Sequence, residues 1–298
     1  MKMDQMKTST FRKKDLIAPI LMVVLLSISV GLIIFYIANP FFNDEIKGPY
    51  VQELQLTDNN VRILYDYVSY APNGERNDVF LTNDSVTKDN MPNKDKLFYA
   101  LQFAKPEDFK STGKRDDNKN QIFNISDKKV DEYMKRFFGS SITYKKEKSL
   151  DYILDFGEDA VYKAKLTYSS ENDGYDTILL TEDDNDEPKQ ESEKEEFIKP
   201  YYTKLYKANL FEDESIELHE KIIYPVVKKV DKLYTLEVYG DFRHKNLIET
   251  RNNLTESQLK SSVFNMNEYI DTAASVFYTF KTEEGIYHFD HSVVANNK

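Results

Sequence analysis

The pattern of apolar and polar positions divides the chain into a short tail, one apolar run and a long remainder. The apolar run, Leu16 to Ala38, contains no charged residue. As a helix it would be roughly 35 Å long, slightly more than the roughly 30 Å hydrocarbon core of a bilayer. The pattern therefore predicts one transmembrane helix at 16–38, preceded by a tail at 1–15 and followed by a folded part at 39–298.

After this run, apolar residues first recur every three or four positions, which is typical of helices. Asp58 and Ser126 are good N-cap residues, and Gly139 is the expected C-terminal stop of the last helix. The polar run Lys110 to Asn120 is expected to be an exposed loop. The pattern predicts three helices, at 57–71, 94–104 and 126–138.

Beyond Gly139 the apolar period changes from 3.6 to 2, the period of half-buried strands. Asp173-Gly174 is expected to form a hairpin turn in which the glycine takes the positive φ. Glu283-Glu284-Gly285 is expected to form the last turn. The strands are predicted at 150–156, 161–169, 175–181, 201–210, 215–227, 232–239, 274–281 and 286–294.

This order of elements predicts an α+β fold, with helices first (about 57–138) and a mainly antiparallel β-sheet after them (about 142–294). No internal repeat and no linker rich in Pro, Gly or Ser divides the part after the apolar run, so one unit is expected. The element order resembles that of NTF2-like domains in secretion and conjugation machines. No residue motif carries this resemblance, and it therefore assigns no site.

Basic residues are concentrated before the apolar run and predict its orientation. Lys2, Lys7 and the cluster Arg12-Lys13-Lys14 precede it, whereas the first seven residues of the other flank hold no basic residue and include Asp44 and Glu45. By the positive-inside rule the N-terminus is cytoplasmic and the C-terminal domain is extracellular. A cleaved signal peptide is the alternative. The run is longer than a signal core of about 7–15 residues, and Tyr36 would occupy a position that requires a small residue, so we expect the anchor to be retained.

Charge and cysteine content restrict the partners. Five of the 40 basic and two of the 51 acidic residues precede the apolar run, so 35 and 49 follow it and give that part a formal charge of −14. Such an excess of carboxylates argues against nucleic acid as a partner. The chain has no cysteine, which excludes disulfides, thiolate metal sites and cysteine nucleophiles. The composition is typical of an AT-rich genome, and we expect a Gram-positive bacterium.

The segment Glu182 to Glu196 carries nine acidic and two basic residues and no large apolar group. It is expected to be a disordered acidic loop. An EF-hand calcium site is the alternative, but that loop requires a glycine at its sixth position and this segment has none.

Candidate catalytic groups all have simpler interpretations. Ser-x-x-Lys occurs at Ser126–Lys129 and at Ser257–Lys260, without the partner motifs of penicillin-recognising enzymes, and Ser126 is expected to serve as a helix cap. Asp151 and Asp155 share one strand face and are expected to hydrate it. Among the four histidines, which include His244, His219 is expected at the surface. His288 is expected to project with Asp290 from the last strand, and His291 with Phe289 from its other face. No catalytic, cofactor or metal residue is therefore assigned.

The strands are also rich in tyrosine, which offers contact area at binding surfaces at low entropic cost. Tyrosine is equally a common strand residue, and we expect packing to explain most of these side chains. The residues in question are Tyr201, Tyr202, Tyr206, Tyr224, Tyr234 and Tyr239.

Together these observations predict a single-pass protein of the bacterial cell membrane whose acidic extracellular α+β domain binds a protein or an envelope component. Catalysis is not indicated. Two alternatives remain open from the sequence. One is an anchored cell-wall or polymer hydrolase that uses a carboxylate pair. The other is an NTF2-like assembly subunit of a secretion or conjugation apparatus.

Overall fold

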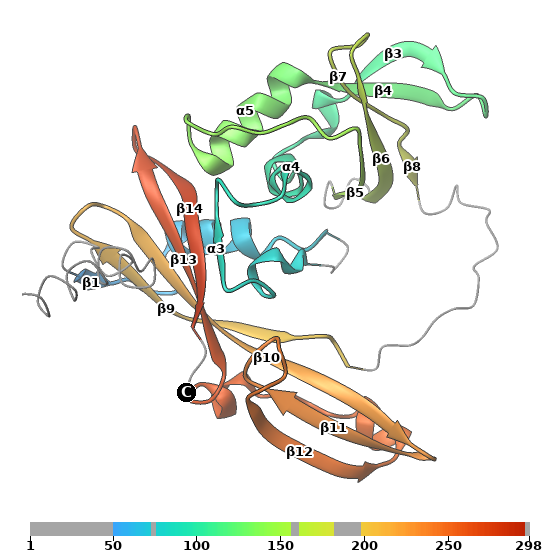
Figure 1. Ribbon diagram of the computed structural model, residues 1–298. Helices are drawn as coiled ribbons and strands as arrows, with labels where there is room; N and C mark the ends of the chain where they lie inside the picture. Colours follow the sequence, from blue (N-terminus) through green and yellow to red (C-terminus); the bar gives the residue numbers. More distant parts are fainter. Residues whose placement is uncertain (1–49, 73–75, 156–160, 182–197, 296–298) are drawn as a thin grey trace, which may run out of the picture. The chain divides into compact units, whose positions relative to one another are not determined.

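The computed structural model describes residues 50–72, 76–155, 161–181 and 198–295 (Figure 1). The apolar run at 16–38 and the acidic segment at 182–196 lie outside these residues. Within the described residues, no helix combines the length and the apolar character needed to cross a membrane.

The described residues form four α-helices and two antiparallel sheets, with most of the ordered backbone in strands. Labels follow Figure 1. The α-helices are α3 (Asn59–Ser69), α4 (Asn93–Leu101), α5 (Asp127–Phe138) and α6 (Glu256–Lys260). Short 3-10 turns are η2 (Asp78–Phe80), η3 (Pro106–Asp108) and η5 (Met266–Tyr269).

The first sheet has the strand order β1-β9-β10-β13-β14-β2, and β11 and β12 extend it from the second half of β10. The long strand β10 therefore pairs with β9 and β13 over its first half and with β11 over its second. The strands are β1 (Tyr50–Glu53), β2 (Ser85–Thr87), β9 (Tyr202–Phe211), β10 (Ile216–Val230), β11 (Leu233–Tyr239), β12 (Leu247–Leu254), β13 (Ala274–Glu283) and β14 (Ile286–Ala295).

The second sheet has the order β3-β4-β7-β6-β5, with β8 paired to β6. It holds residues from the middle of the chain, coloured green to olive in Figure 1. Its strands are β3 (Lys110–Arg115), β4 (Gln121–Ser126), β5 (Ser149–Asp155), β6 (Val161–Ser169), β7 (Gly174–Thr177) and β8 (Leu180–Thr181).

The three expected helices are confirmed, together with their caps. The backbone N–H of Asn60 donates to Asp58 Oδ1 at 2.8 Å, and that of Lys129 donates to Ser126 Oγ at 3.3 Å. Gly139 ends α5 with a φ of +86°, a conformation that costs glycine little. The apolar stripe of α5 is buried as the spacing predicts, at Val130, Tyr133, Met134, Phe137 and Phe138.

The predicted division into helices first and one sheet afterwards is only partly right. Strands β1 to β4 alternate with the helices, and β3 lies within Lys110 to Asn120, where an exposed loop was expected. Most side chains of β3 are exposed, so no apolar alternation marked it as a strand. Its partner β4 holds it in place, because Ile125 of β4 is fully buried in the larger of the two hydrophobic cores, called the main core below.

The strands after Gly139 also divide between two sheets, whereas one was expected. β5 to β8 join β3 and β4, while β9 to β14 join β1 and β2. Strand periodicity reports which face of a strand is buried but not which strands pair, so the sequence offered no signal for this division. β12 was missed because its polar sequence carries almost no apolar alternation.

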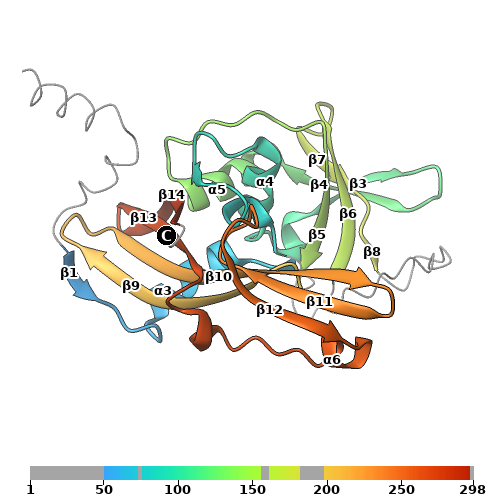
Figure 2. The same ribbon diagram turned by 60° about the horizontal axis from the view of Figure 1, so that its bottom comes forward.

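Two hydrophobic cores hold these elements. The larger contains side chains from both sheets and from α3, α4 and α5, with an aromatic centre at Phe80, Tyr99, Phe137, Tyr278 and Phe289. The smaller lies beside the extension β10-β11-β12, where α6 contacts β11 and β12 (Figure 2). Both sheets thus share one core, and the extension has its own.

The hairpin at Asp173-Gly174 is confirmed, but its expected turn chemistry is wrong. Asp173, and not Gly174, has the positive φ, at +47°. Gly174 is needed because two strands approach closely: a Cβ there would lie 2.2 Å from the carbonyl oxygen of Ile125 and 2.8 Å from Ser126 Cα. The glycine thus permits the contact between β4 and β7.

Gly174→Ala is therefore expected to lower the free energy of unfolding by about 1–3 kcal/mol, because β4 and β7 must separate to admit the methyl group. Asp173→Gly, one residue away, is the matched control and should change stability by less than about 0.5 kcal/mol. Thermal unfolding of the detergent-solubilised chain checks both. Equal losses for the two variants would contradict the close-approach explanation.

Candidate functional site

The most deeply buried charge of the described residues is Glu220, and it pairs with Arg76. Glu220 lies on β10, on the face that packs into the main core, and its side chain is fully buried. Arg76 comes from the segment before η2 and is almost as buried. Its Nη1 and Nη2 donate to Glu220 Oε1 at 2.8 Å and Oε2 at 3.0 Å, respectively. This bidentate geometry is the strongest form of such a pair.

Two tyrosine hydroxyls complete the hydrogen bonds of this carboxylate. Tyr65 of α3 donates to Oε1 at 2.5 Å, and Tyr278 of β13 donates to Oε2 at 2.6 Å. Arg76 Nη2 also donates to the Tyr278 hydroxyl at 2.8 Å. The cluster therefore ties a helix, two strands and a connecting segment to one carboxylate. We call Tyr65, Arg76, Glu220 and Tyr278 the Glu220 cluster.

The electrostatics of the Glu220 cluster favour fixed protonation states. Burial raises the pKa of Glu220, but the charge and hydrogen bonds of Arg76 outweigh it and hold that pKa below its ordinary value. Burial raises the pKa of Tyr65 and of Tyr278 well above the ordinary value of tyrosine; the charge of Glu220 raises it further, and that of Arg76 opposes the rise. A general acid or base needs a pKa near neutrality. The cluster is therefore suited to holding the core together.

A second polar group lies on the opposite face of β10, around His219. Glu217 Oε1 lies 2.8 Å from His219 Nε2, and Asn209 Nδ2 lies 3.0 Å from the same nitrogen. The hydroxyl of Tyr206 lies 3.5 Å from Nδ1. Both ring nitrogens thus face side chains of β9 and β10. The alternation that places His219 with Glu217 and Lys221 is confirmed, but His219 is only 9% exposed, so the expected surface position is wrong.

A third polar group, formed by Asp290, His291 and Lys281, lies at a bulge in β14. Thr279 of β13 pairs with His291, whereas the next residue, Phe280, pairs with Phe289, so Asp290 is the extra residue. Asp290 Oδ2 lies 2.8 Å from His291 Nδ1 and accepts from Lys281 Nζ at 2.9 Å. Burial raises the pKa of Asp290, but these hydrogen bonds and charges lower it more, to about 2.

This lowered pKa gives a prediction for stability against pH. A carboxylate whose folded-state pKa is depressed stabilises the fold above its ordinary pKa, and the contribution is lost as the pH falls through the folded value. Asp290→Asn should therefore cost about 1–2 kcal/mol at neutral pH, and the difference should shrink as the pH falls from about 4 towards 2. Urea unfolding across this range measures it. Asp66→Asn, on the exposed side of α3, is the control, and a pH-independent difference for Asp290→Asn would contradict the account.

The remaining candidates from the sequence have structural roles. Ser126 caps α5, and Lys129 pairs with Glu132 at 3.0 Å. Ser257 is exposed on the short helix α6, where Lys260 pairs with Glu256 at 3.0 Å. Ser126 lies where β4 passes directly into α5, and its Oγ is used there as the cap that accepts the backbone N–H of Lys129.

The acidic and histidine candidates are likewise dispersed. Asp151 is exposed on β5, and the side chain of Asp155 lies outside the described residues. His288 Nδ1 lies 2.9 Å from the carbonyl oxygen of Arg136, at the end of α5. His244 occupies a turn with a φ of +54°. Over the described ranges, no three His, Asp or Glu side chains converge in a way that could hold a metal ion.

The strand tyrosines are explained by packing. Tyr224 is buried in the main core, and Tyr201 and Tyr239 pack against it. Tyr202 and Tyr234 pack against the smaller core, and Tyr206 lies beside His219 and under the ammonium of Lys221. Tyr224 is buried and the other five are partly buried, so packing accounts for much of their surface.

Sequence reasoning missed the Glu220 cluster, although one signal for it was present. On β10 the apolar face runs Ile216, Leu218, Ile222 and Tyr224, and Glu220 lies in phase with it. A carboxylate in the middle of a buried face requires a buried partner. The partner itself lies 144 residues away in the chain, in a segment without regular periodicity.

Comparison with known proteins adds no relative: no protein-family model, no curated protein and no solved structure matches this chain.

Proposed function

We propose that this chain is a single-pass membrane protein of a bacterial cell envelope whose extracellular α+β domain binds a protein or another envelope component. The observation that carries the proposal is the uncharged run Leu16 to Ala38, directly after the cluster Arg12-Lys13-Lys14. Such a run is long enough to span a bilayer, and the basic flank retains the N-terminus in the cytoplasm. A domain held at a membrane is concentrated there for binding.

The hydrogen bonds of the reactive side chains that the structure describes favour a binding role over catalysis. Glu220 is saturated by three donors, His219 faces its own sheet, and Ser126 caps a helix. Each of these three side chains, which could in principle act in catalysis, thus has a role in holding the fold. A rigid scaffold of this kind suits a domain that presents surfaces to partners.

The anchoring half of the proposal is tested by placing charges in the middle of the run. Leu25→Arg with Ile28→Arg should shift the chain from the alkali-resistant membrane fraction to the soluble fraction, because each arginine disfavours insertion by about 2.5–3.5 kcal/mol. Leu25→Phe with Ile28→Leu is the matched apolar control and should stay in the membrane. A wild-type chain that alkali extracts completely would overturn the proposal.

The binding half is tested by the size of the complex that the full chain forms in its membrane. After chemical cross-linking of intact cells, detergent extraction should yield a discrete species larger than the chain itself. A matched control carries residues 1–49 on an unrelated domain and should yield none. A chain that migrates alone under all cross-linking conditions would contradict a binding role.

A further inference from the structure

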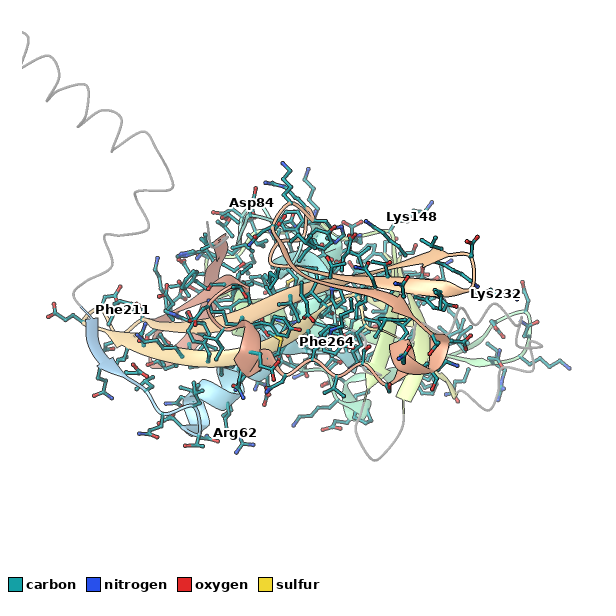
Figure 3. All side chains as sticks on the ribbon, turned by 90° about the horizontal axis from the view of Figure 1, so that it is seen from below. Arg62, Asp84, Lys148, Phe211, Lys232 and Phe264 are labelled. Carbon is teal, nitrogen blue, oxygen red and sulfur yellow. The ribbon has the colours of Figure 1, made fainter. Side chains whose placement is uncertain are left out.

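The tip of the β10–β11 hairpin concentrates exposed apolar side chains. Of the eight large apolar residues that the described residues expose, three lie within seven positions here: Val227, Val230 and Leu233, at 40%, 62% and 38% exposure. Val230 and Leu233 are cross-strand partners, joined by the turn Asp231-Lys232. Lys232, labelled in Figure 3, marks this end of the extension. We call residues 227–233 the hairpin tip.

The hairpin tip is also positively charged against an acidic background. It holds the exposed residues Lys228, Lys229 and Lys232 and one acidic residue, Asp231, whereas the part of the chain after the apolar run carries a formal charge of −14. Lys228 Nζ pairs with Glu237 of β11 at 2.7 Å, so the positive charge of the tip comes mainly from Lys229 and Lys232. Charges in water are screened over roughly 8–10 Å at physiological ionic strength. A seven-residue hairpin end extends for about 10–13 Å, so an approaching surface meets the lysines before it meets most of the carboxylates.

The composition of the tip separates two classes of partner. Energetic centres of protein interfaces are enriched in Trp, Tyr and Arg, and lysine is depleted there. The hairpin tip has only aliphatic residues, lysines and the turn residue Asp231. Aliphatic side chains flanked by lysines suit the boundary of a lipid bilayer. The long stem of a lysine can stay in apolar surroundings while its ammonium group reaches the phosphates.

We propose that the hairpin tip is a contact site for anionic lipid headgroups. Val230 and Leu233 enter the headgroup layer, and Lys229 and Lys232 bind the lipid phosphates. Each lysine near an anionic membrane strengthens association roughly fivefold. This attraction is weak by itself and becomes effective for a chain already held at a membrane, so the inference rests on the proposed function.

The absence of native cysteine allows a direct test. Val230→Cys in the full chain is labelled with an environment-sensitive fluorophore, and the protein is incorporated into nanodiscs of phosphatidylcholine alone or mixed with phosphatidylglycerol. We expect a blue-shifted emission and quenching by lipid-borne quenchers in the anionic nanodiscs only. Adding Lys229→Ala and Lys232→Ala should reduce the contact equilibrium by roughly 25-fold, as two fivefold steps.

The control is Ile286→Cys, which places the same probe on the exposed tip of the β13–β14 hairpin. Its emission should not depend on lipid composition. Equal emission of the Val230→Cys probe in both lipids, or an equal response of both probes, would overturn the inference while leaving the anchor intact. A chain that does not co-elute with nanodiscs would instead overturn the proposed function. Unchanged near-ultraviolet circular dichroism verifies that each variant is folded.

Discussion

Glu220→Ala is expected to lower the free energy of unfolding by about 3–5 kcal/mol, because it leaves the guanidinium of Arg76 buried without its counterion. Three donors now converge on that carboxylate, and two of them, the hydroxyls of Tyr65 and Tyr278, would also lose their acceptor. For a domain of this size the loss corresponds to a fall in melting temperature of roughly 6–20 °C. Thermal unfolding followed by tyrosine circular dichroism measures it.

The double variant Arg76→Met with Glu220→Leu distinguishes a charge effect from a packing effect. Replacing both partners with apolar residues of similar volume often restores stability, whereas removing one leaves a buried charge. The double variant should therefore be more stable than Glu220→Ala. If the two were equally unstable, the penalty would come from lost packing and the electrostatic account of the Glu220 cluster would be wrong.

Phe137→Ala is expected to cost about 3–5 kcal/mol, because it opens a cavity at the aromatic centre of the main core. Phe137 is 1% exposed. Its ring stacks on Tyr99 of α4 at 5.4 Å between centroids and on Phe289 of β14 at 5.7 Å. The substitution thus removes contacts between α5, α4 and the first sheet at once.

Phe137→Leu is the matched variant, since it keeps most of the apolar volume and loses mainly the ring contacts. It should cost clearly less than the alanine change in the same thermal assay. Ile63→Ala, on the exposed side of α3, should stay within about 0.5 kcal/mol of the wild type. A small effect of Phe137→Ala would mean that this side chain is not central to the core.

Local features of the fold could be predicted from the sequence because each depends on neighbouring residues. The spacing of Val130, Tyr133, Met134 and Phe137 identifies the buried stripe of α5, and Ser126 and Gly139 mark its ends. The turn at Glu284-Gly285 is found where expected, with both residues at positive φ. These predictions needed no knowledge of distant contacts.

Features that depend on distant contacts could not be predicted in the same way. The partner of Glu220 is set by a pairing across 144 residues, and β3 is a strand because β4 carries the buried Ile125. The bulge at Asp290 reverses which residues of β14 face the core, so His291 lies beside Asp290 and Thr279 and not with Phe289. Periodicity alone does not report a bulge.

The account as a whole depends on the proposed membrane anchoring and orientation of the chain, and one measurement tests both directly. Two single-cysteine variants, Ile286→Cys and Ser9→Cys, are each treated on intact cells with a membrane-impermeant maleimide. The account predicts that the Ile286→Cys variant reacts on intact cells, whereas the Ser9→Cys variant reacts only after the membrane is permeabilised. Labelling of Ser9→Cys on intact cells, or of Ile286→Cys only after permeabilisation, would contradict it.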